Sequence, residues 1–109
     1  MISDENLPLV FYATFSSMEE AERIGRKLIE ERIVACINII PKIISIYEWE
    51  GQQRRDTECG VLIKSRIGLK NKIISRVQQL HSYEIPALLA LNIDGGSKEF
   101  ISWLGLQTK

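Results

Sequence analysis

The sequence is poor in the residues on which most recognisable catalytic and metal-binding motifs depend. Its 109 residues include one histidine and two cysteines. They contain no phosphate-binding glycine loop, no nucleophile elbow, no CxxC pair and no HExxH helix. Two cysteines, Cys36 and Cys59, are too few for a disulfide framework, and we expect free thiols in a reducing cytoplasm. The sequence therefore gives no support to conventional hydrolase, NTPase or zinc-finger functions.

An excess of charge and long apolar runs are also missing. Fourteen basic residues balance fourteen acidic ones, so no net charge attracts nucleic acid or an anionic membrane. No apolar run reaches the ~18 residues of a membrane span, and residues 1–6 are polar and acidic, unlike a signal peptide. We predict one cytoplasmic domain over residues 1–109, with 1–6 as a flexible tail and neither nucleic acid nor membrane as partner.

Apolar segments predict buried strands, and segments with helical periodicity alternate with them. The strands are expected over residues 7–15, 33–50 with a break at Pro41, 57–66 and 86–93, and residues 51–56 are expected to form a polar turn. The helices are expected after Ser16 and Ser17, over residues 68–80, and after Ser97. The order βαββαβ plus a C-terminal helix indicates an α+β ferredoxin-like sandwich with an extended hairpin and helices on one sheet face.

The predicted strands are apolar on both faces, although the helices can cover only one of them. At ~25 cal/mol per Å², a large wet apolar face is costly for a domain whose stability is only ~5–15 kcal/mol. On the hairpin, Ile44 and Ile46 lie on one face, and Tyr47 and Trp49 lie on the other. A closed homo-oligomer would cover both surfaces. The alternative is that the C-terminal helix folds across the open face.

The metal-ligand candidates are His81, Cys36 and Glu84. Thiolate and imidazole ligands favour Cu or Zn over Mg, but these residues show no tight ligand spacing. His81 has a second interpretation as a residue at a helix C-terminus, where a cationic imidazole interacts favourably with the helix dipole. Cys36 has a second interpretation as a small buried hydrophobe. Lys64 is placed to pair with an anion or with a nearby acidic side chain.

Several motifs together resemble the CutA family of divalent-cation-tolerance proteins. They are VACINIIP at 34–41, SIYEWEG at 45–51, IKSR at 63–66 and HSYEIPALLAL at 81–91, followed by Trp103. The resemblance runs from about Leu9 to Leu104. It implies a ferredoxin-like fold, a stable trimer similar in architecture to PII signalling proteins, and a link to tolerance of copper and other divalent cations. The family's motif positions fall on Cys36, Asn38, Tyr47, Trp49, Gly51, Lys64, His81, Tyr83, Glu84 and Pro86.

This resemblance leads to a functional prediction for each group of residues. We expect a homotrimer that binds or regulates rather than catalyses, with Tyr47 and Trp49 in its interface. Lys64, Tyr83 and Asn38 are expected to line a cleft between subunits. The alternative is a PII-like sensor or an enzyme with a small-anion or nucleotide site between subunits. Two departures weaken the copper interpretation: Ala13 stands where some members carry a cysteine, and Leu80 stands where some carry a second histidine.

Overall fold

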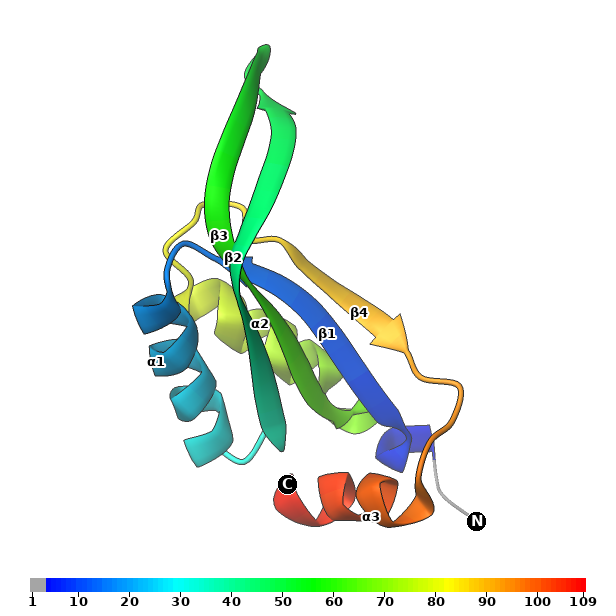
Figure 1. Ribbon diagram of the computed structural model, residues 1–109. Helices are drawn as coiled ribbons and strands as arrows, with labels where there is room; N and C mark the ends of the chain where they lie inside the picture. The colour runs from blue at the N-terminus through cyan, green and yellow to red at the C-terminus, as the bar shows by residue number, and fades with distance from the viewer. Residues whose placement is uncertain (1–3) are drawn as a thin grey trace.

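In the computed structural model, which describes residues 4–109, an antiparallel sheet is backed by helices on one face (Figure 1). The strands are β1 (Pro8–Phe15), β2 (Cys36–Trp49), β3 (Gln52–Arg66) and β4 (Leu88–Asn92), in the spatial order β2-β3-β1-β4. The helices are α1 (Met18–Glu30), α2 (Lys70–Leu80) and α3 (Lys98–Gln107), with short 3-10 turns η1 (Asp4–Asn6) and η2 (Ile67–Leu69). This arrangement confirms the predicted ferredoxin-like α+β sandwich.

The core lies between the sheet and helices α1 and α2. Alternate residues of a strand point to one face, and in β1 the residues on the helix side are almost completely buried, as Phe11 and Phe15 show. They pack in one cluster with apolar residues of α1 and α2, among them Ile24, Leu28 and Val77. The period-2 pattern of the strands and the period-3.6 pattern of the helices therefore meet in a single core.

Helix α1 begins at a predicted serine cap. The Ser17 side chain accepts a hydrogen bond from the Glu20 backbone N–H at 3.1 Å. The Glu20 carboxylate turns back and accepts from both the backbone N–H and the hydroxyl of Ser16, each at 3.1 Å. These bonds satisfy donors that a helix N-terminus leaves free. Helix α2 has no such side-chain cap and follows the 3-10 turn η2 instead.

The β2–β3 hairpin is much longer than ordinary strands. Its arms have 14 and 15 residues, against a usual length of about 5–6. The hairpin projects beyond the sheet (Figure 1), and the molecule measures 49 × 26 × 22 Å. The turn consists of Glu50 and Gly51, both at positive φ, which is the geometry of a tight two-residue hairpin turn. The predicted turn at residues 51–56 is therefore wrong, because all but the first of these residues belong to β3.

The sheet face opposite α1 and α2 is largely uncovered in the single chain. The strand register places one row of side chains from each strand on this face. The rows are Cys36, Asn38 and Ile40 of β2, Leu62 and Lys64 of β3, Val10 and Tyr12 of β1, and Leu89 and Leu91 of β4. Leu89 is 65% exposed. Helix α3 lies at one end of the sheet (Figure 1), where the Lys64 ammonium is 5.5 Å from the Phe100 ring centroid. Helix α3 thus covers only one end, and we name the remainder the open face.

Part of the predicted N-terminal tail forms a short 3-10 turn. Residues 1–3 lie outside the described residues, whereas Asp4–Asn6 form η1. The backbone N–H of Ile67 donates to the Leu7 carbonyl at 2.9 Å, and the Arg66 guanidinium donates to the Glu5 carbonyl at 3.4 Å. Residues 4–7 thus contact the segment around Arg66, and the flexibility of residues 1–6 stays a prediction.

A buried hydroxyl provides a test of the core. The Ser65 side chain is fully buried and donates to the Ile33 carbonyl at 2.7 Å. We expect Ser65→Ala to lower the free energy of unfolding by about 1–3 kcal/mol, because a buried carbonyl loses its donor. Urea denaturation at one fixed protein concentration measures the loss. The control is Ser75→Ala on exposed α2 surface; equal stability of the two variants would contradict the assignment.

Candidate functional site

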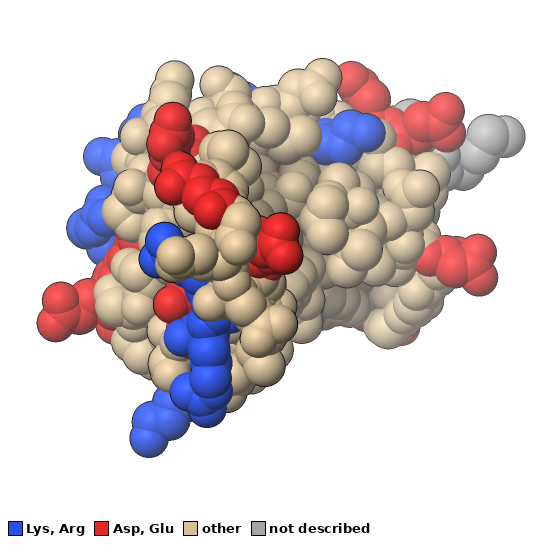
Figure 2. Space-filling view, turned by 90° about the horizontal axis from the view of Figure 1, so that it is seen from above, with Lys and Arg blue, Asp and Glu red and all other residues tan. Residues whose placement is uncertain are grey.

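A groove of about 600 Å³ lies where the hairpin leaves the sheet. Its floor and walls come from β2 (Ser45, Tyr47, Trp49), β3 (Arg54, Asp56, Glu58), β1 (Tyr12, Thr14) and the segment between α2 and β4 (Tyr83, Glu84, Ile85, Ala87). Seen from above, acidic and basic side chains both lie around the hairpin (Figure 2). A concave, partly aromatic site of this size falls in the range of small-molecule sites. We call it the hairpin groove.

Two tyrosine–carboxylate pairs line the hairpin groove. The Tyr83 hydroxyl donates to a Glu58 carboxylate oxygen at 2.8 Å, and the Tyr47 hydroxyl donates to Asp56. Burial and the bond to Glu58 raise the pKa of Tyr83 far above its ordinary value, and the hydrogen bond to Asp56 raises the pKa of Tyr47. Both phenols therefore stay protonated and act as donors that hold the two carboxylates in place.

His81 fixes the groove wall that follows α2. Its ring is buried and stacks on Phe15 with centroids 4.6 Å apart. The ring Nδ1 accepts from the Tyr83 backbone N–H at 3.0 Å, so the proton is assigned to Nε2, which lies 2.8 Å from the Thr14 carbonyl. Both ring nitrogens are thus occupied within the chain. His81 ends α2, as its helix-end interpretation predicted.

Glu20 ties the same wall to α1. Its carboxylate accepts from the Ser82 backbone N–H at 3.0 Å and from Ser16. Burial on its own raises the pKa of Glu20, but the hydrogen bonds from Ser82 and Ser16 outweigh it and hold the pKa below its ordinary value. The ionised carboxylate is therefore the form that the folded chain stabilises.

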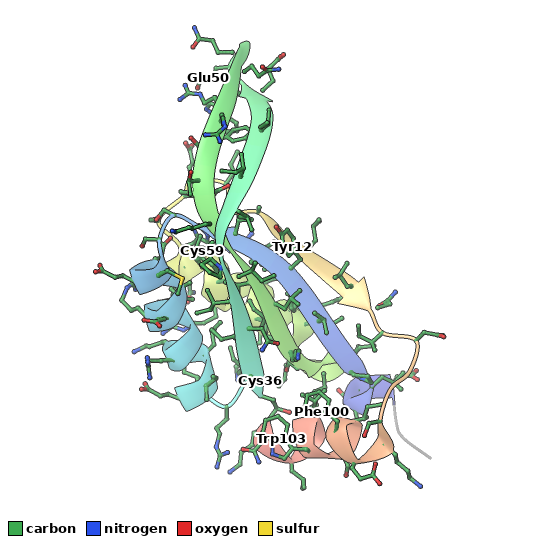
Figure 3. The ribbon with its side chains drawn as sticks, viewed as in Figure 1. Tyr12, Cys36, Glu50, Cys59, Phe100 and Trp103 are labelled. Carbon is green, nitrogen blue, oxygen red and sulfur yellow. The ribbon has the colours of Figure 1, made fainter. Side chains whose placement is uncertain are left out.

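The structure does not bring the three predicted metal ligands together in one chain. Cys36 of β2 pairs with Lys64 of β3, and Lys64 in turn pairs with Val10 of β1. His81 instead contacts Thr14 of β1. Four residues of strand separate those two positions on β1, or about 13 Å. Figure 3 shows Cys36 at the lower end of the sheet near Phe100, and Tyr12 nearer the hairpin. Within residues 4–109 no three His, Cys, Asp or Glu side chains are grouped so that they could hold a metal ion.

The other predicted residues are divided between two surfaces. Glu84 and Tyr83 line the hairpin groove, as do Tyr47 and Trp49. Asn38 and Lys64 lie on the open face instead. Burial raises the pKa of the half-buried Cys36 thiol, and the positive charge of Lys64 partly opposes this. Cys59 is a free thiol that is buried on the helix side.

Sequence reasoning missed the roles of Arg54, Asp56 and Glu58 in the groove. The first two fall in the segment expected to be a turn, and Glu58 falls near the start of the strand expected over residues 57–66. No ion pair between them is present in the part of the chain that the structure describes. Had the turn been placed at Glu50 and Gly51, the alternation of the two arms would have put these three residues on the same face of the hairpin as the aromatic side chains of β2.

Comparison with known proteins assigns this chain to a family. Residues 9–107 match the family described as CutA1 divalent ion tolerance protein. The chain belongs to the CutA1 family. It is 40% identical over 95 residues to the divalent-cation tolerance protein CutA of Thermus thermophilus, covering 87% of this chain and 92% of the relative.

Solved CutA1 structures share the fold of this family member. A structure from Thermus thermophilus, named divalent cation tolerance protein (Cut A1), has a TM-score of 0.91 and 38% identity over 94% of this chain and 100% of that one. A structure named periplasmic divalent cation tolerance protein CutA, from Archaeoglobus fulgidus, has a TM-score of 0.91 and 36% identity over 94% and 100% of the two chains.

Some CutA relatives are longer than this chain and carry the names of other compartments. The Arabidopsis thaliana protein CutA, chloroplastic, is 35% identical over 98% of this chain, which spans 59% of that relative's length. Among residues 4–109 of this CutA1 chain, the helices are too short or too polar to cross a membrane. These two relatives are named for the chloroplast and the periplasm, and the cytoplasmic location expected for this chain stays a prediction.

The Glu20 bonds predict a pH dependence of stability. The pKa of Glu20 in the folded chain lies below its ordinary value. The stability that its carboxylate contributes is therefore fully present above the pKa of the unfolded chain, and it is lost as pH falls through the pKa of the folded chain. We expect Glu20→Gln to destabilise the protein near pH 7 and to lose less stability than wild type on acidification. Melting temperatures from pH 7 to pH 3 test this. Glu19→Gln, an exposed neighbour, should follow the wild-type profile; parallel curves for Glu20→Gln and wild type would refute the role.

Proposed function

We propose that this chain acts in divalent-cation tolerance as a homotrimer that binds or regulates rather than catalyses. The observation that carries the proposal is the family match over residues 9–107. Relatives from Thermus thermophilus and Pyrococcus horikoshii are named divalent-cation tolerance proteins. The alternative of a PII-like nucleotide sensor or an enzyme has no support in these names.

Self-association is supported by apolar surface that the single chain leaves wet. On the open face, Leu89 is 65% exposed; on the hairpin, Ile46 is 66% exposed and Trp49 41%. Patches of this kind on a small domain are typical of interaction surfaces. The threefold symmetry itself is drawn from the family resemblance. In this proposal Tyr47 and Trp49 contact a neighbouring copy, and Lys64, Tyr83 and Asn38 line the cleft between copies.

For the metal ion we propose copper or zinc, with His81, Cys36 and Glu84 as candidate ligands. Because Cys36 lies about 13 Å along the sheet from the strand position that His81 contacts, a site that uses both residues needs ligands from different copies. Binding at His81 also requires one of its two ring hydrogen bonds to break. Glu84 is exposed and needs no such rearrangement.

The proposed compartment is the cytoplasm. Cys36 and Cys59 are both free thiols, which suits a reducing environment. Expression of the chain with a fluorescent tag in its own host would locate it.

Light scattering tests the assembly. We expect a mass three times the 12.5 kDa of one chain at micromolar concentration, and a mass near that of one chain would refute the trimer.

Trp49→Ala should weaken association and lower the melting temperature, since an interface aromatic contributes about 2 kcal/mol or more. Trp49→Phe keeps a large ring and should lose less. An intact trimer with an unchanged melting temperature in Trp49→Ala would contradict the interface role.

Calorimetric titration of Cu(II) and Zn(II) tests the metal ligands. We expect His81→Ala to weaken binding, and wild-type affinity to fall at acid pH because only neutral imidazole binds a metal ion. Glu84→Gln and Cys36→Ser examine the other two candidates in the same assay. If His81→Ala lowers the melting temperature but leaves metal affinity unchanged, His81 is structural and the hydrogen bonds to Thr14 and Tyr83 account for its presence.

A further inference from the structure

The connector between β4 and α3 places an aspartate beside a glycine in an irregular, exposed segment. Residues 93–97 belong to neither a helix nor a strand (Figure 1), and both Asp94 and Gly95 are exposed. Among the residues that the structure describes, no hydrogen bond or ion pair engages the Asp94 carboxylate or the Gly95 backbone N–H. We propose that Asp94 is a modification site, at which the folded protein isomerises to isoaspartate through a cyclic imide formed with the Gly95 nitrogen.

The dipeptide Asp94-Gly95 has no equivalent elsewhere in the sequence. In the 109 residues, no other aspartate and no asparagine is followed by glycine. Asp4 precedes Glu5, and Asp56 precedes Thr57. A glycine has no Cβ to obstruct the approach of its nitrogen to the preceding carboxyl group, and its backbone dihedrals are the least restricted. The chemistry is therefore expected at this one aspartate.

The reaction uses only atoms of the chain and water. The Gly95 nitrogen attacks Cγ of the protonated Asp94 carboxyl; the nitrogen loses its proton, an N–Cγ bond forms and one carboxyl oxygen leaves as water. The imide ring then takes up one water. Cleavage of the new N–Cγ bond restores aspartate. Cleavage of the original bond between the Asp94 main-chain carbonyl carbon and the Gly95 nitrogen gives isoaspartate, in which the main chain runs through Cβ and Cγ. The sum is an isomerisation, with no change of mass and no oxidant.

The structure leaves room for this ring to form. Apart from its chain neighbours, no heavy atom lies within 4 Å of a Cβ built on Gly95, and the nearest to one built on Gly96 is Cδ1 of Ile101 at 3.9 Å. A segment with so little packing reorients at low local cost. Asp56 lies instead in the β2–β3 ladder opposite Ser45, and its carboxylate accepts the Tyr47 hydroxyl.

Helix α3 is held by contacts that do not involve the connector dipeptide. The Ser97 hydroxyl accepts from the Phe100 backbone N–H at 3.3 Å at the start of the helix. Near its end, the Arg66 guanidinium donates to the Thr108 hydroxyl at 3.1 Å. The main chain between β4 and α3 can therefore gain one atom at Asp94 while both elements keep their own hydrogen bonds.

The experiment measures isoaspartate in the intact native protein. The full chain is incubated near neutral pH at physiological temperature, and samples are labelled with isoaspartyl carboxyl methyltransferase and radioactive S-adenosylmethionine, which methylate the free α-carboxylate of isoaspartate. Tryptic mapping with electron-transfer fragmentation then locates the label. We expect it in the peptide 77–98, which holds Asp94 as its only aspartate. Accumulation at Asp94 should be at least about tenfold faster than at Asp56, which reacts only after local opening of the ladder.

Two variants of the dipeptide separate this chemistry from general ageing. Gly95→Ala fits without strain, because Gly95 has open space around it and is not among the residues at positive φ. It should slow isoaspartate formation by about tenfold or more, since the added Cβ obstructs the nitrogen. Asp94→Glu keeps the charge but must close a larger ring, and it should remove the label from the peptide 77–98. Light scattering and thermal melting of both variants confirm that they keep the native assembly.

A sample unfolded in urea shows whether the native assembly itself permits the reaction. Label at Asp94 in the unfolded chain but none in the native protein would overturn the proposal. Equal labelling of Asp94 and Asp56, an unchanged rate in Gly95→Ala, or label that persists in Asp94→Glu would also overturn it. The result is separate from the divalent-cation proposal, because no metal ion is added and none of the candidate metal ligands is changed.

Discussion

The pairing of β2 with β3 is the interaction on which the other features of this molecule depend. β1 pairs with β3 only from Cys59 to Arg66, so the rest of the β3 backbone has β2 as its only ladder partner. The hairpin therefore continues as a two-stranded ribbon after the core ends. Isolated two-stranded ribbons are at best marginally stable in water. The aromatic and isoleucine side chains of the ribbon are exposed in the single chain, and the proposed trimer would cover them.

The segment between α2 and β4 converts this ribbon into one side of a groove. Three contacts with three other structural elements fix it: His81 to Thr14, Ser82 to Glu20 and Tyr83 to Glu58. A fourth, between Tyr83 and His81, lies within the segment. These contacts give the HSYE stretch a structural role in the folded chain. Each of its first three residues holds the backbone or a neighbouring carboxylate in position, and the same hydrogen bonds occupy the imidazole that would otherwise be the most obvious metal ligand.

The sequence was sufficient for most of the fold because local and periodic signals agree. Each local signal predicts one kind of element: the serine cap and the apolar stripes predict helices at α1 and α2, and the alternation in β1 predicts a strand. The outer half of β3 could not be recognised, since Gln52–Asp56 touch no core and carry no apolar alternation. The turn was misplaced for that reason, and with it the carboxylates of the hairpin groove. The separation of Cys36 from His81 was equally out of reach, because it depends on strand register rather than on residue type.

The break in β2 has a consequence for how other chains can meet this molecule. β2 is an edge strand of the sheet, with β3 on one side only. Between Ile40 and Ile43 the ladder is interrupted, where Pro41 has no N–H to donate and Lys42 has left-handed backbone dihedrals. The row of free backbone groups is therefore divided into two short edges instead of one long one. A strand added from another chain can continue along one of them but not smoothly across both, which limits open-ended fibre growth from this edge.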